Sequence, residues 1–229
     1  MQGDPNAQYE LGVHYFRGEH VTKDWEEAVR WCRMAAEQGH TRAQWSLGNC
    51  YGEGRGAAKD EIEAIKWYRR AADKGDVVGQ VTLGVCYAHG TGVVKDEAEA
   101  VRWWRMAAEQ EQVEDALNHV VVDAQYRMGC CLQEGVGVAQ DEIEAVNWFR
   151  KAAEAGNGVA CLSLGKCYWR GKGLKENSIK AHAWLSVADA LGYSEARTTI
   201  RRLEESMSSS QISEAKKLAR ELQAMIKMR

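Results

Sequence analysis

Apolar and small residues follow one pattern that recurs along the chain every 36 residues. A Leu-Gly pair marks its register at Leu11-Gly12, Leu47-Gly48 and Leu83-Gly84. Around each pair, apolar or small positions recur at spacings of three and four, which predicts a buried stripe on a helix. A glycine-rich break and a second stripe of Ala and Trp follow. The pattern predicts stacked helix–turn–helix repeats, each of which buries its apolar face against its neighbours.

The predicted helices begin at recurring polar signals. Asp4 should cap the first helix, with Pro5 at its first position, and Gly18 should end it. An Asp-x-x-Glu capping box should begin the second helix of most repeats, with the Asp accepting a helix N–H and the Glu reaching back to the cap. The boxes are Asp24/Glu27, Asp60/Glu63, Asp96/Glu99 and Asp141/Glu144. Because these acid pairs recur from repeat to repeat, a structural role is favoured over catalysis or metal binding.

Glycines mark the turns and the helix ends. Pairs such as Gly54 and Gly56 should supply positive φ after the first helix of a repeat. A phosphate-binding loop is the alternative, but no Lys-Ser/Thr follows the glycines and no strand precedes them. Each second helix carries a tryptophan that should fill the space between repeats. These tryptophans are Trp31, Trp67, Trp103, Trp148 and Trp184, and the glycines that stop the helices are Gly39, Gly75, Gly156 and Gly192.

The third repeat departs from the pattern. From Gly84 to Gly129 is 45 residues, nine more than the period, and Glu111 stands where the stop glycine is expected. The extra segment lies within 110–123. Without that glycine, either the second helix runs on toward Asn118 or the next helix begins early. The insertion is either a tolerated loop, or a partner contact or kink that alters the curvature of the array.

These signals predict one all-α solenoid domain over residues 1–229. Its repeats should span about 4–39, 40–75, 76–123 with the insertion near 110–123, 124–156 and 157–194. The fifth repeat keeps a capping residue, Asn177, but lacks the Glu of the box. Residues 195–229 should form C-terminal capping helices, the first ending near Met207 and the last capped by Ser208 and Gln211.

Composition agrees with a helical protein and argues against several functions. With 45% hydrophobic residues, nine Trp and one Pro in 229 residues, helix should dominate around an ample core. A net charge of −3 with mixed signs indicates neither nucleic acid nor an anionic membrane as the main partner. No apolar run approaches the roughly 20 residues that span a bilayer. Neither a Ser-x-x-Lys motif nor a metal-spaced His/Cys set occurs, and we expect no buried pairing of a His with a nucleophile.

The seven cysteines are interpreted by position. Four of them occupy one repeat position, namely Cys50, Cys86, Cys131 and Cys167. Equivalent positions in stacked repeats lie about 8–10 Å apart, too far for a disulfide, so these should be small buried residues. A minor disulfide among Cys32, Cys130 and Cys161 stays open, and a reducing, cytoplasmic compartment is favoured. Because Met1–Asp4 aligns with the repeat end Glu37–His40, an upstream export signal also stays possible.

The repeat pattern A-x-A-Q-x-x-L-G-x-x-Y-x-x-G-x-G-V-x-x-D-x-x-x-A-x-x-W-Y-x-x-A-A-x-x-G resembles the Sel-one-like repeat (SLR) family, which is related to tetratricopeptide repeats. The C-terminal tail resembles the closing helix of bacterial members. Five units carry the repeat pattern, with departures at Leu132 for Tyr, Glu111 for Gly and Ala57 for Val. The resemblance implies a right-handed α/α superhelix with a concave groove. It also implies an adaptor, because family members are scaffolds in signalling, in membrane-protein quality control and at envelope or host contacts. Cysteine-rich relatives pair two cysteines within each repeat, whereas this chain keeps one recurring Cys.

Matching the first helix of each repeat to its tetratricopeptide counterpart places a set of variable positions on the concave side. The candidate partner-binding residues are Tyr9, Phe16, Arg17, Trp45, Asn49, Glu53, Val85, His89, Tyr126, Gln133, Lys166, Trp169 and Arg170. They differ between copies, as expected of a surface without packing duties. Trp45 and Trp169 are the strongest anchor candidates, since aromatic residues dominate interface energetics. Packing between adjacent helices is the alternative for both.

We therefore expect a non-catalytic protein–protein interaction scaffold that binds a peptide or protein in the concave groove. Neither a cofactor, a metal, a nucleic acid nor membrane insertion is expected. One alternative is a secreted or periplasmic repeat protein that binds an envelope or host partner. A more remote alternative, raised by some cysteine-rich relatives, is a β-lactam-binding or hydrolytic enzyme.

Overall fold

The computed structural model describes residues 3–111 and 113–227, and every regular element in those ranges is a helix. The predicted all-α fold is thereby confirmed. Two compact units, residues 1–120 and 121–229, make up the chain. The single domain over 1–229 and its concave groove stay predictions, and Met1 and Gln2, where the expected repeat remnant starts, lie outside the described residues. No helix in the described part of the chain is both long and apolar enough to cross a membrane.

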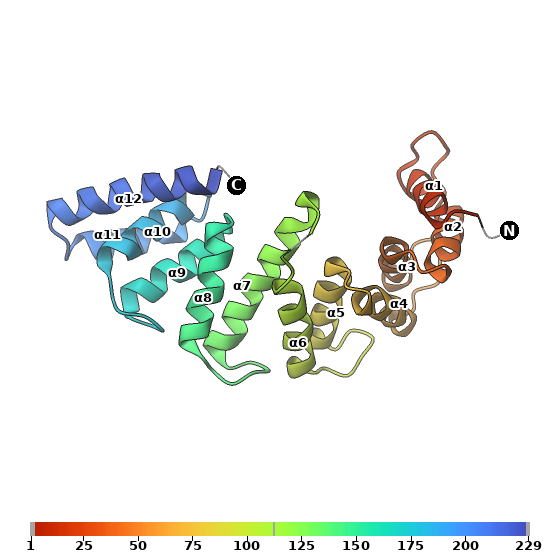
Figure 1. Cartoon of the computed structure of the whole chain (residues 1–229), viewed down its shortest axis with the longest axis horizontal. Helices are drawn as coiled ribbons and strands as arrows, with labels where there is room; N and C mark the ends of the chain where they lie inside the picture. The colour runs from red at the N-terminus through yellow and green to blue at the C-terminus, as the bar shows by residue number, and fades with distance from the viewer. Residues whose placement is uncertain (1–2, 112, 228–229) are drawn as a thin grey trace. The chain divides into compact units, whose positions relative to one another are not determined.

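Unit 1 contains three helix pairs in which each helix packs against the next one along the chain (Figure 1). The pairs are α1 (Pro5–Arg17) with α2 (Trp25–Glu37), α3 (Thr41–Glu53) with α4 (Glu61–Asp73), and α5 (Val77–His89) with α6 (Glu97–Ala108). A short 3-10 helix, Asp115–Leu117, follows α6. We call the first helix of each pair the A helix and the second the B helix.

Unit 2 continues the alternation and ends in the predicted capping helices. Its elements are α7 (Asn118–Glu134), whose first residues fall at the end of unit 1, α8 (Glu142–Glu154), α9 (Gly158–Arg170), α10 (Ser178–Ala190), α11 (Glu195–Glu204) and α12 (Ser209–Lys227). Both α11 and α12 pack against α10, so they cover the last repeat (Figure 1). Ser208 and Gln211 form the predicted box at α12: the Ser208 N–H donates to the Gln211 side chain at 2.8 Å, and the Gln211 N–H donates back at 3.3 Å.

Aspartate side chains cap the B helices as predicted. At α4, Oδ1 of Asp60 accepts a hydrogen bond of 2.9 Å from the backbone N–H of Glu63. Asp24, Asp96 and Asp141 make the equivalent bond, and Asn177 does so in the fifth repeat. Each cap contributes on the order of 1 kcal/mol to the stability of its helix.

The prediction that the Glu side chain of each box accepts a hydrogen bond from the N–H of its capping Asp is wrong. The N–H of Asp60 donates instead to the carbonyl of Tyr51, near the end of the preceding A helix, at 2.9 Å. The same backbone bond recurs at the other B-helix caps, so the Glu side chain has no N-cap donor left to satisfy. It turns to other partners: Glu99, for example, accepts a 3.0 Å hydrogen bond from Nε1 of Trp103.

The turn after each A helix passes through the left-handed region, as predicted. Gly54 and Gly56 have φ of 70° and 69°. The equivalent glycines of the later repeats are Gly90, Gly92, Gly135, Gly137, Gly171 and Gly173, all with positive φ. In the first repeat His20 takes φ of 65° where the others have glycine.

A second set of glycines lets each B helix approach its A helix closely. A Cβ on Gly48 would lie 2.6 Å from ring atoms of Tyr68, a separation that Cβ atoms do not tolerate. The same conflict arises in every repeat with the residue twenty positions later. The other pairs are Gly12–Cys32 at 2.7 Å, Gly84–Trp104 at 2.4 Å, Gly129–Phe149 at 2.5 Å and Gly165–Leu185 at 2.7 Å. One bare backbone position per repeat therefore accommodates side chains that range from Cys to Trp.

The insertion in the third repeat does not lengthen the B helix. Helix α6 ends at Ala108, so the expectation that it runs on toward Asn118 is wrong. The other alternative is confirmed: α7 begins at Asn118 and has 17 residues, whereas α3 has 13. Gln112, inside the predicted insertion, lies outside the described residues.

Side-chain contacts within unit 1 hold the segment that follows α6. Nε2 of Gln110 donates to the backbone carbonyl of Gly75 at 2.9 Å and to Oε1 of Gln80 at 2.8 Å. Further along, Glu114 forms an ion pair with Arg42 at the start of α3. Gln38 makes the equivalent bond to Gln8 after α2, so the third repeat keeps this contact although it lacks the stop glycine.

Replacing Trp103 by Ala should destabilise the protein by about 3–5 kcal/mol, because the indole is 1% exposed and its removal leaves a cavity. Urea unfolding followed by circular dichroism measures the change. Val94→Ala is the control, since that side chain is 88% exposed and its loss should change stability by less than about 0.5 kcal/mol. Equal effects of the two substitutions would contradict the placement of the indole in the core.

Candidate functional site

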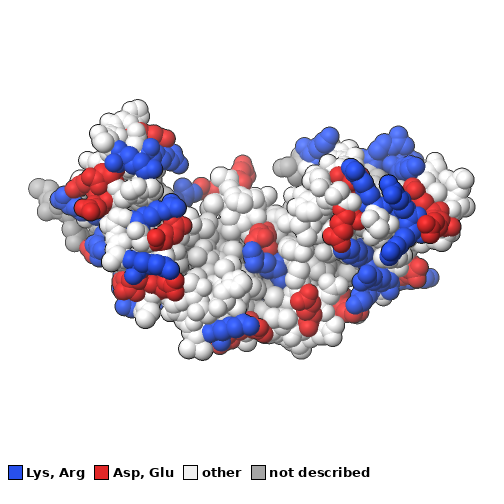
Figure 2. Space-filling view, turned by 180° about the vertical axis from the view of Figure 1, so that it is seen from behind, with Lys and Arg blue, Asp and Glu red and all other residues white. Residues whose placement is uncertain are grey.

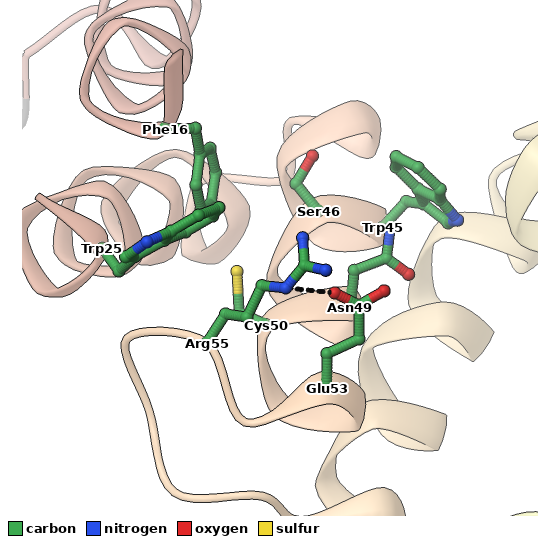
Figure 3. Close-up of a pocket in the computed structure, with 8 residues that line it drawn as sticks. All are labelled: Phe16, Trp25, Trp45, Ser46, Asn49, Cys50, Glu53 and Arg55. Atoms are coloured by element: carbon green, nitrogen blue, oxygen red, sulfur yellow. Dashed lines mark ion pairs between the residues drawn. The ribbon is translucent and has the colours of Figure 1, made fainter. Parts of the chain in front are cut away.

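Four of the predicted partner-binding residues meet in a pocket of unit 1. The pocket has a volume of about 280 Å³ and is bounded by α1, α2, α3 and the turn after α3 (Figure 3). Its lining consists of Phe16, Trp25, Trp45, Ser46, Asn49, Cys50, Glu53 and Arg55. Phe16, Trp45, Asn49 and Glu53 were predicted from the sequence. We call this the aromatic pocket.

Phe16 and Trp25 form one side of the aromatic pocket (Figure 3). Their ring centroids lie 5.4 Å apart at an interplanar angle of 58°. Nζ of Lys23 lies 4.5 Å and the guanidinium carbon of Arg55 lies 5.4 Å from the centroid of Trp25, both within cation–π range. Two cations therefore contact the ring of Trp25.

Sequence reasoning missed Trp25, although a signal was present. Trp25 is the first residue of α2, and the other repeats have Glu61, Glu97, Glu142 and Ser178 at this position. A tryptophan where the other copies have short polar residues is not needed by the framework. The signal is variation between copies at the start of the B helices, the same kind of variation that marks the candidate positions on the A helices.

Trp45, on the opposite side of the pocket, has two roles. Its Nε1 donates a 3.2 Å hydrogen bond to Oγ1 of Thr82 on α5, and the ring packs against the core around α4 and α5. It also lines the aromatic pocket. The alternative for Trp45 was packing between adjacent A helices. Part of the ring does pack against α5 in this way, while another part faces the pocket.

Polar groups lie between the two aromatic sides. Oε2 of Glu53 pairs with Nε of Arg55 at 2.8 Å, and Oδ1 of Asn49 accepts a 2.7 Å hydrogen bond from the hydroxyl of Tyr68 (Figure 3 shows the ion pair). The Glu53 and Arg55 side chains are 53% and 58% exposed, so the pair is in contact with solvent. Cys50 is buried, and burial raises the pKa of its thiol to about 12.

A second pocket lies at the same repeat positions in unit 2. It has a volume of about 240 Å³ and is lined by Tyr126, Cys130, Gln133, Glu134, Ser163, Lys166, Cys167, Arg170 and Lys172. Ser163, Cys167 and Lys172 follow Ser46, Cys50 and Arg55 by 117 residues, which is also the spacing from Gly48 to Gly165. Tyr126, Gln133, Lys166 and Arg170 were predicted. We call this the basic pocket.

Charge distinguishes the basic pocket from the aromatic one. Three cations, Lys166, Arg170 and Lys172, line it against one carboxylate, Glu134. Burial is also the main reason why the pKa of Tyr126 rises to about 12, so its hydroxyl stays neutral. On the face shown in Figure 2, by contrast, positive and negative side chains are interspersed, and the net charge of the chain is −3.

Five predicted residues line neither pocket. Tyr9 stacks on His40 with ring centroids 4.6 Å apart, and Arg17 lies 3.7 Å from Glu19. Val85 is half-buried and His89 is exposed on α5. Trp169 lies under the guanidinium of Arg170, 5.6 Å from its carbon. These residues stay candidates without a shared cavity.

The expectation that no buried histidine pairs with a nucleophile is wrong. His182 on α10 is 1% exposed; its Nε2 lies 2.9 Å from Oε1 of Glu204 on α11, and its Nδ1 lies 3.3 Å from Oγ of Ser186. Neither pocket includes this group, and its contacts tie α11 to α10. Because Ser186 follows His182 by four residues, one helix face brings them together. Within the described residues, no group of three or more His, Cys, Asp or Glu is placed to hold a metal ion.

Comparison with known proteins agrees with this architecture. The Sel1 repeat family model matches residues 5–40, 41–76, 78–111, 122–157 and 158–193, most of the chain. The chain belongs to the Sel1 repeat family. The matched segments follow the helix pairs, and the gap between the third and fourth corresponds to the insertion.

Three solved structures resemble this Sel1 repeat protein. A Sel1 repeat protein from Oxalobacter formigenes is 33% identical with a TM-score of 0.72, and the match covers 87% of this chain and 76% of that one. The protective antigen c5321 from uropathogenic Escherichia coli is 28% identical with a TM-score of 0.56; the match covers 96% of this chain but 53% of that one. A putative Sel1 repeat protein from Klebsiella pneumoniae is 25% identical with a TM-score of 0.50, covering 88% and 94%. The comparison with curated proteins found no match.

All seven cysteines are free thiols, and burial makes several of them weak acids. The pKa rises from 9.0 to about 12 at Cys32 and Cys161 and to about 11 at Cys86 and Cys167, in each case chiefly by burial. A raised folded-state pKa favours folding while the unfolded thiols are still protonated. This contribution is complete below about pH 9 and is lost as the pH rises toward the folded-state values.

The free energy of unfolding should therefore fall as the pH rises above about 9, because thiols in the unfolded chain ionise before the buried ones. Urea unfolding at a series of pH values under reducing conditions measures the change. Cys161→Ala removes one such group and should lose less stability over the same pH range than the unsubstituted protein. A urea midpoint that stays constant through this range would contradict the burial of the thiols.

Proposed function

We propose that this Sel1 repeat protein is a non-catalytic interaction scaffold that binds a peptide or protein segment on the A-helix face of unit 1, anchored in the aromatic pocket. Sel1 repeat proteins are generally protein-interaction scaffolds. The observation that carries the more specific proposal is that Phe16, Trp25 and Trp45 share one solvent-accessible pocket. Aromatic residues at a pocket are the commonest energetic anchors of protein interfaces.

The pocket offers a guest both apolar surface and polar contacts. Phe16, Trp25 and Trp45 are each only partly buried, so an apolar guest side chain would remove further ring surface from water. Such burial contributes about 25 cal/mol per Å². The exposed pair of Glu53 and Arg55 contributes little to folding, and its groups can bond to a guest backbone at small cost.

Variation between repeats supports the same surface. The glycines at which the A and B helices approach closely, the caps and the turn glycines recur, whereas the residues that make the pocket aromatic do not. Phe16 corresponds to Gln133 in the basic pocket, and Trp45 corresponds to Leu162. The framework therefore does not require these side chains, which leaves them available for recognition.

A second candidate places the same binding role in the periplasm or on a host-facing surface. It is favoured by the 28% identity to the Escherichia coli protein described as a protective antigen. The seven free thiols favour a reducing compartment instead. Titration of thiols in denatured protein from its native cells distinguishes the two candidates.

A peptide selection tests the scaffold proposal. Phage-displayed random peptides selected on the immobilised protein should enrich sequences with an aromatic or large aliphatic residue, which fits the aromatic pocket. Fluorescence anisotropy with an enriched peptide should show binding weakened at least about tenfold by Trp25→Ala, because an anchor contact is lost.

Ile62→Ala is the control, since Ile62 is a large apolar residue of unit 1 that is 64% exposed and lines neither pocket. Its peptide affinity should stay within about twofold of the unsubstituted protein, a small free-energy change. Circular dichroism verifies that both variants are folded. Failure to enrich any peptide, or equal weakening by the two substitutions, would refute the anchoring role of the aromatic pocket.

A further inference from the structure

We infer that the basic pocket binds an acidic side chain of a peptide, with Arg170 and Lys172 holding its carboxylate. The inference rests on the proposed peptide-binding function and adds a second subsite of different chemistry. It starts from the equivalence of the two pockets, whose linings share repeat positions 117 residues apart. At two of these positions the aromatic pocket has one acidic and one basic residue, whereas the basic pocket has two basic residues. This difference in charge indicates an acidic guest.

In the aromatic pocket the side chains at these two positions have opposite charges that neutralise each other. Glu53 occupies the first and Arg55 the second, and their side chains form an ion pair of 2.8 Å. In the basic pocket the same positions carry Arg170 and Lys172. Two cations cannot form that pair, so the carboxylate that Glu53 supplies in unit 1 has no counterpart at its position in unit 2. A carboxylate from a bound peptide supplies the missing charge.

Arg170 is the cation best placed to receive this guest. In the described residues no carboxylate forms an ion pair with it, and its guanidinium lies over the ring of Trp169 at 5.6 Å. Stacking on an aromatic ring leaves the N–H groups at the edge of the guanidinium plane available. An Arg fork binds a carboxylate through two parallel hydrogen bonds, which favours Asp or Glu side chains over a point anion.

The other two cations already have partners, but the pairs are weak. Nζ of Lys172 lies 3.9 Å from Glu142, and Nζ of Lys166 lies 2.7 Å from Glu195, whose side chain is 70% exposed. Ion pairs in contact with solvent contribute about 0–1 kcal/mol, so a guest carboxylate exchanges with them at little cost. A lysine whose pair is exchanged in this way contributes its positive charge to the bound guest.

Glu134 opposes the guest and supplies a further test. Its carboxylate lines the same pocket on α7, together with Tyr126 and Cys130. Among the lining residues three cations face this one carboxylate, and Glu195 and Glu142, outside the lining, pair with two of those cations. Removing the Glu134 charge should therefore strengthen the binding of an acidic peptide, the opposite of what removing Arg170 does.

Binding of a fluorescein-labelled oligoglutamate peptide to the full chain, measured by anisotropy at low ionic strength, tests the inference. The unsubstituted protein should bind it more tightly than an oligoglutamine peptide of equal length. Arg170→Glu should weaken binding at least about tenfold, because a charge-assisted bidentate contact is replaced by repulsion. Glu134→Gln should strengthen it, and added salt should weaken it through screening.

Arg202→Glu is the matched control, since Arg202 is an exposed arginine of unit 2 on α11 and does not line the pocket. It makes the same change in net charge and should leave the affinity within about twofold. Equal weakening by Arg170→Glu and Arg202→Glu, or an affinity that does not rise in Glu134→Gln, would overturn the subsite. So would competition by inorganic phosphate, or by single-stranded DNA of equal charge, that matches unlabelled oligoglutamate.

Trp25→Ala separates this inference from the proposed function. That substitution lies in the aromatic pocket of unit 1 and should leave oligoglutamate binding unchanged. If Arg170→Glu abolishes oligoglutamate binding while no aromatic peptide binds unit 1, the acidic subsite stands and the aromatic anchor falls. If aromatic peptides bind but oligoglutamate does not, the acidic subsite falls alone.

Discussion

Close approach of the two helices at a single glycine is the constraint on which every repeat depends. The A helix presents a backbone without a side chain, and the B helix fills that space with the residue twenty positions later. A methyl group on Gly84 would lie 2.4 Å from the indole of Trp104, a distance that neither atom tolerates. Because the filling residue changes from Cys32 to Trp104 while the glycine does not, backbone proximity rather than one side-chain fit defines the pair.

This constraint explains how the chain separates framework from recognition. The close-approach glycine, the Asp caps and the turn glycines fix each helix pair, and the outer positions of the A helices then vary without loss of packing. Two pockets at equivalent positions illustrate the result. One has Phe16, Trp25 and the ion pair of Glu53 with Arg55. The other has two cations, Arg170 and Lys172, at the repeat positions of that pair. The same scaffold thus presents two different chemistries.

Most of the fold was predictable from the sequence, because its determinants are local and repeated. Helix starts at Asp caps and turns at paired glycines depend on a few adjacent residues, and the 36-residue spacing shows them several times. The errors arose where a distant contact decides the outcome. Gln110 bonds to Gly75 of the preceding repeat just after α6, where the sequence allowed the helix to continue, and the backbone bond from Asp60 to Tyr51 removes the donor expected for a capping Glu.

The candidate site was less predictable. Variation between copies indicated four A-helix residues of each pocket, but Trp25 comes from a B helix and is brought to Phe16 by the turn between them. The contact of His182 with Glu204 joins a repeat to a capping helix, and no repeat spacing indicates it. A sequence pattern predicts which residues share one helix face. Contacts across a turn or a repeat boundary can be identified only from the structure.

The most direct test of this account compares Gly48→Ala with Gly52→Ala by urea unfolding. The two glycines lie one turn apart on α3, so both substitutions bring a similar gain in helix propensity, about 1 kcal/mol. A Cβ at Gly48 would lie 2.6 Å from Tyr68 ring atoms, whereas one at Gly52 would have its nearest neighbour at 3.4 Å. The account predicts that Gly48→Ala destabilises the protein and Gly52→Ala does not. Equal stability of the two variants would contradict the claim that close approach at this glycine holds the repeats together.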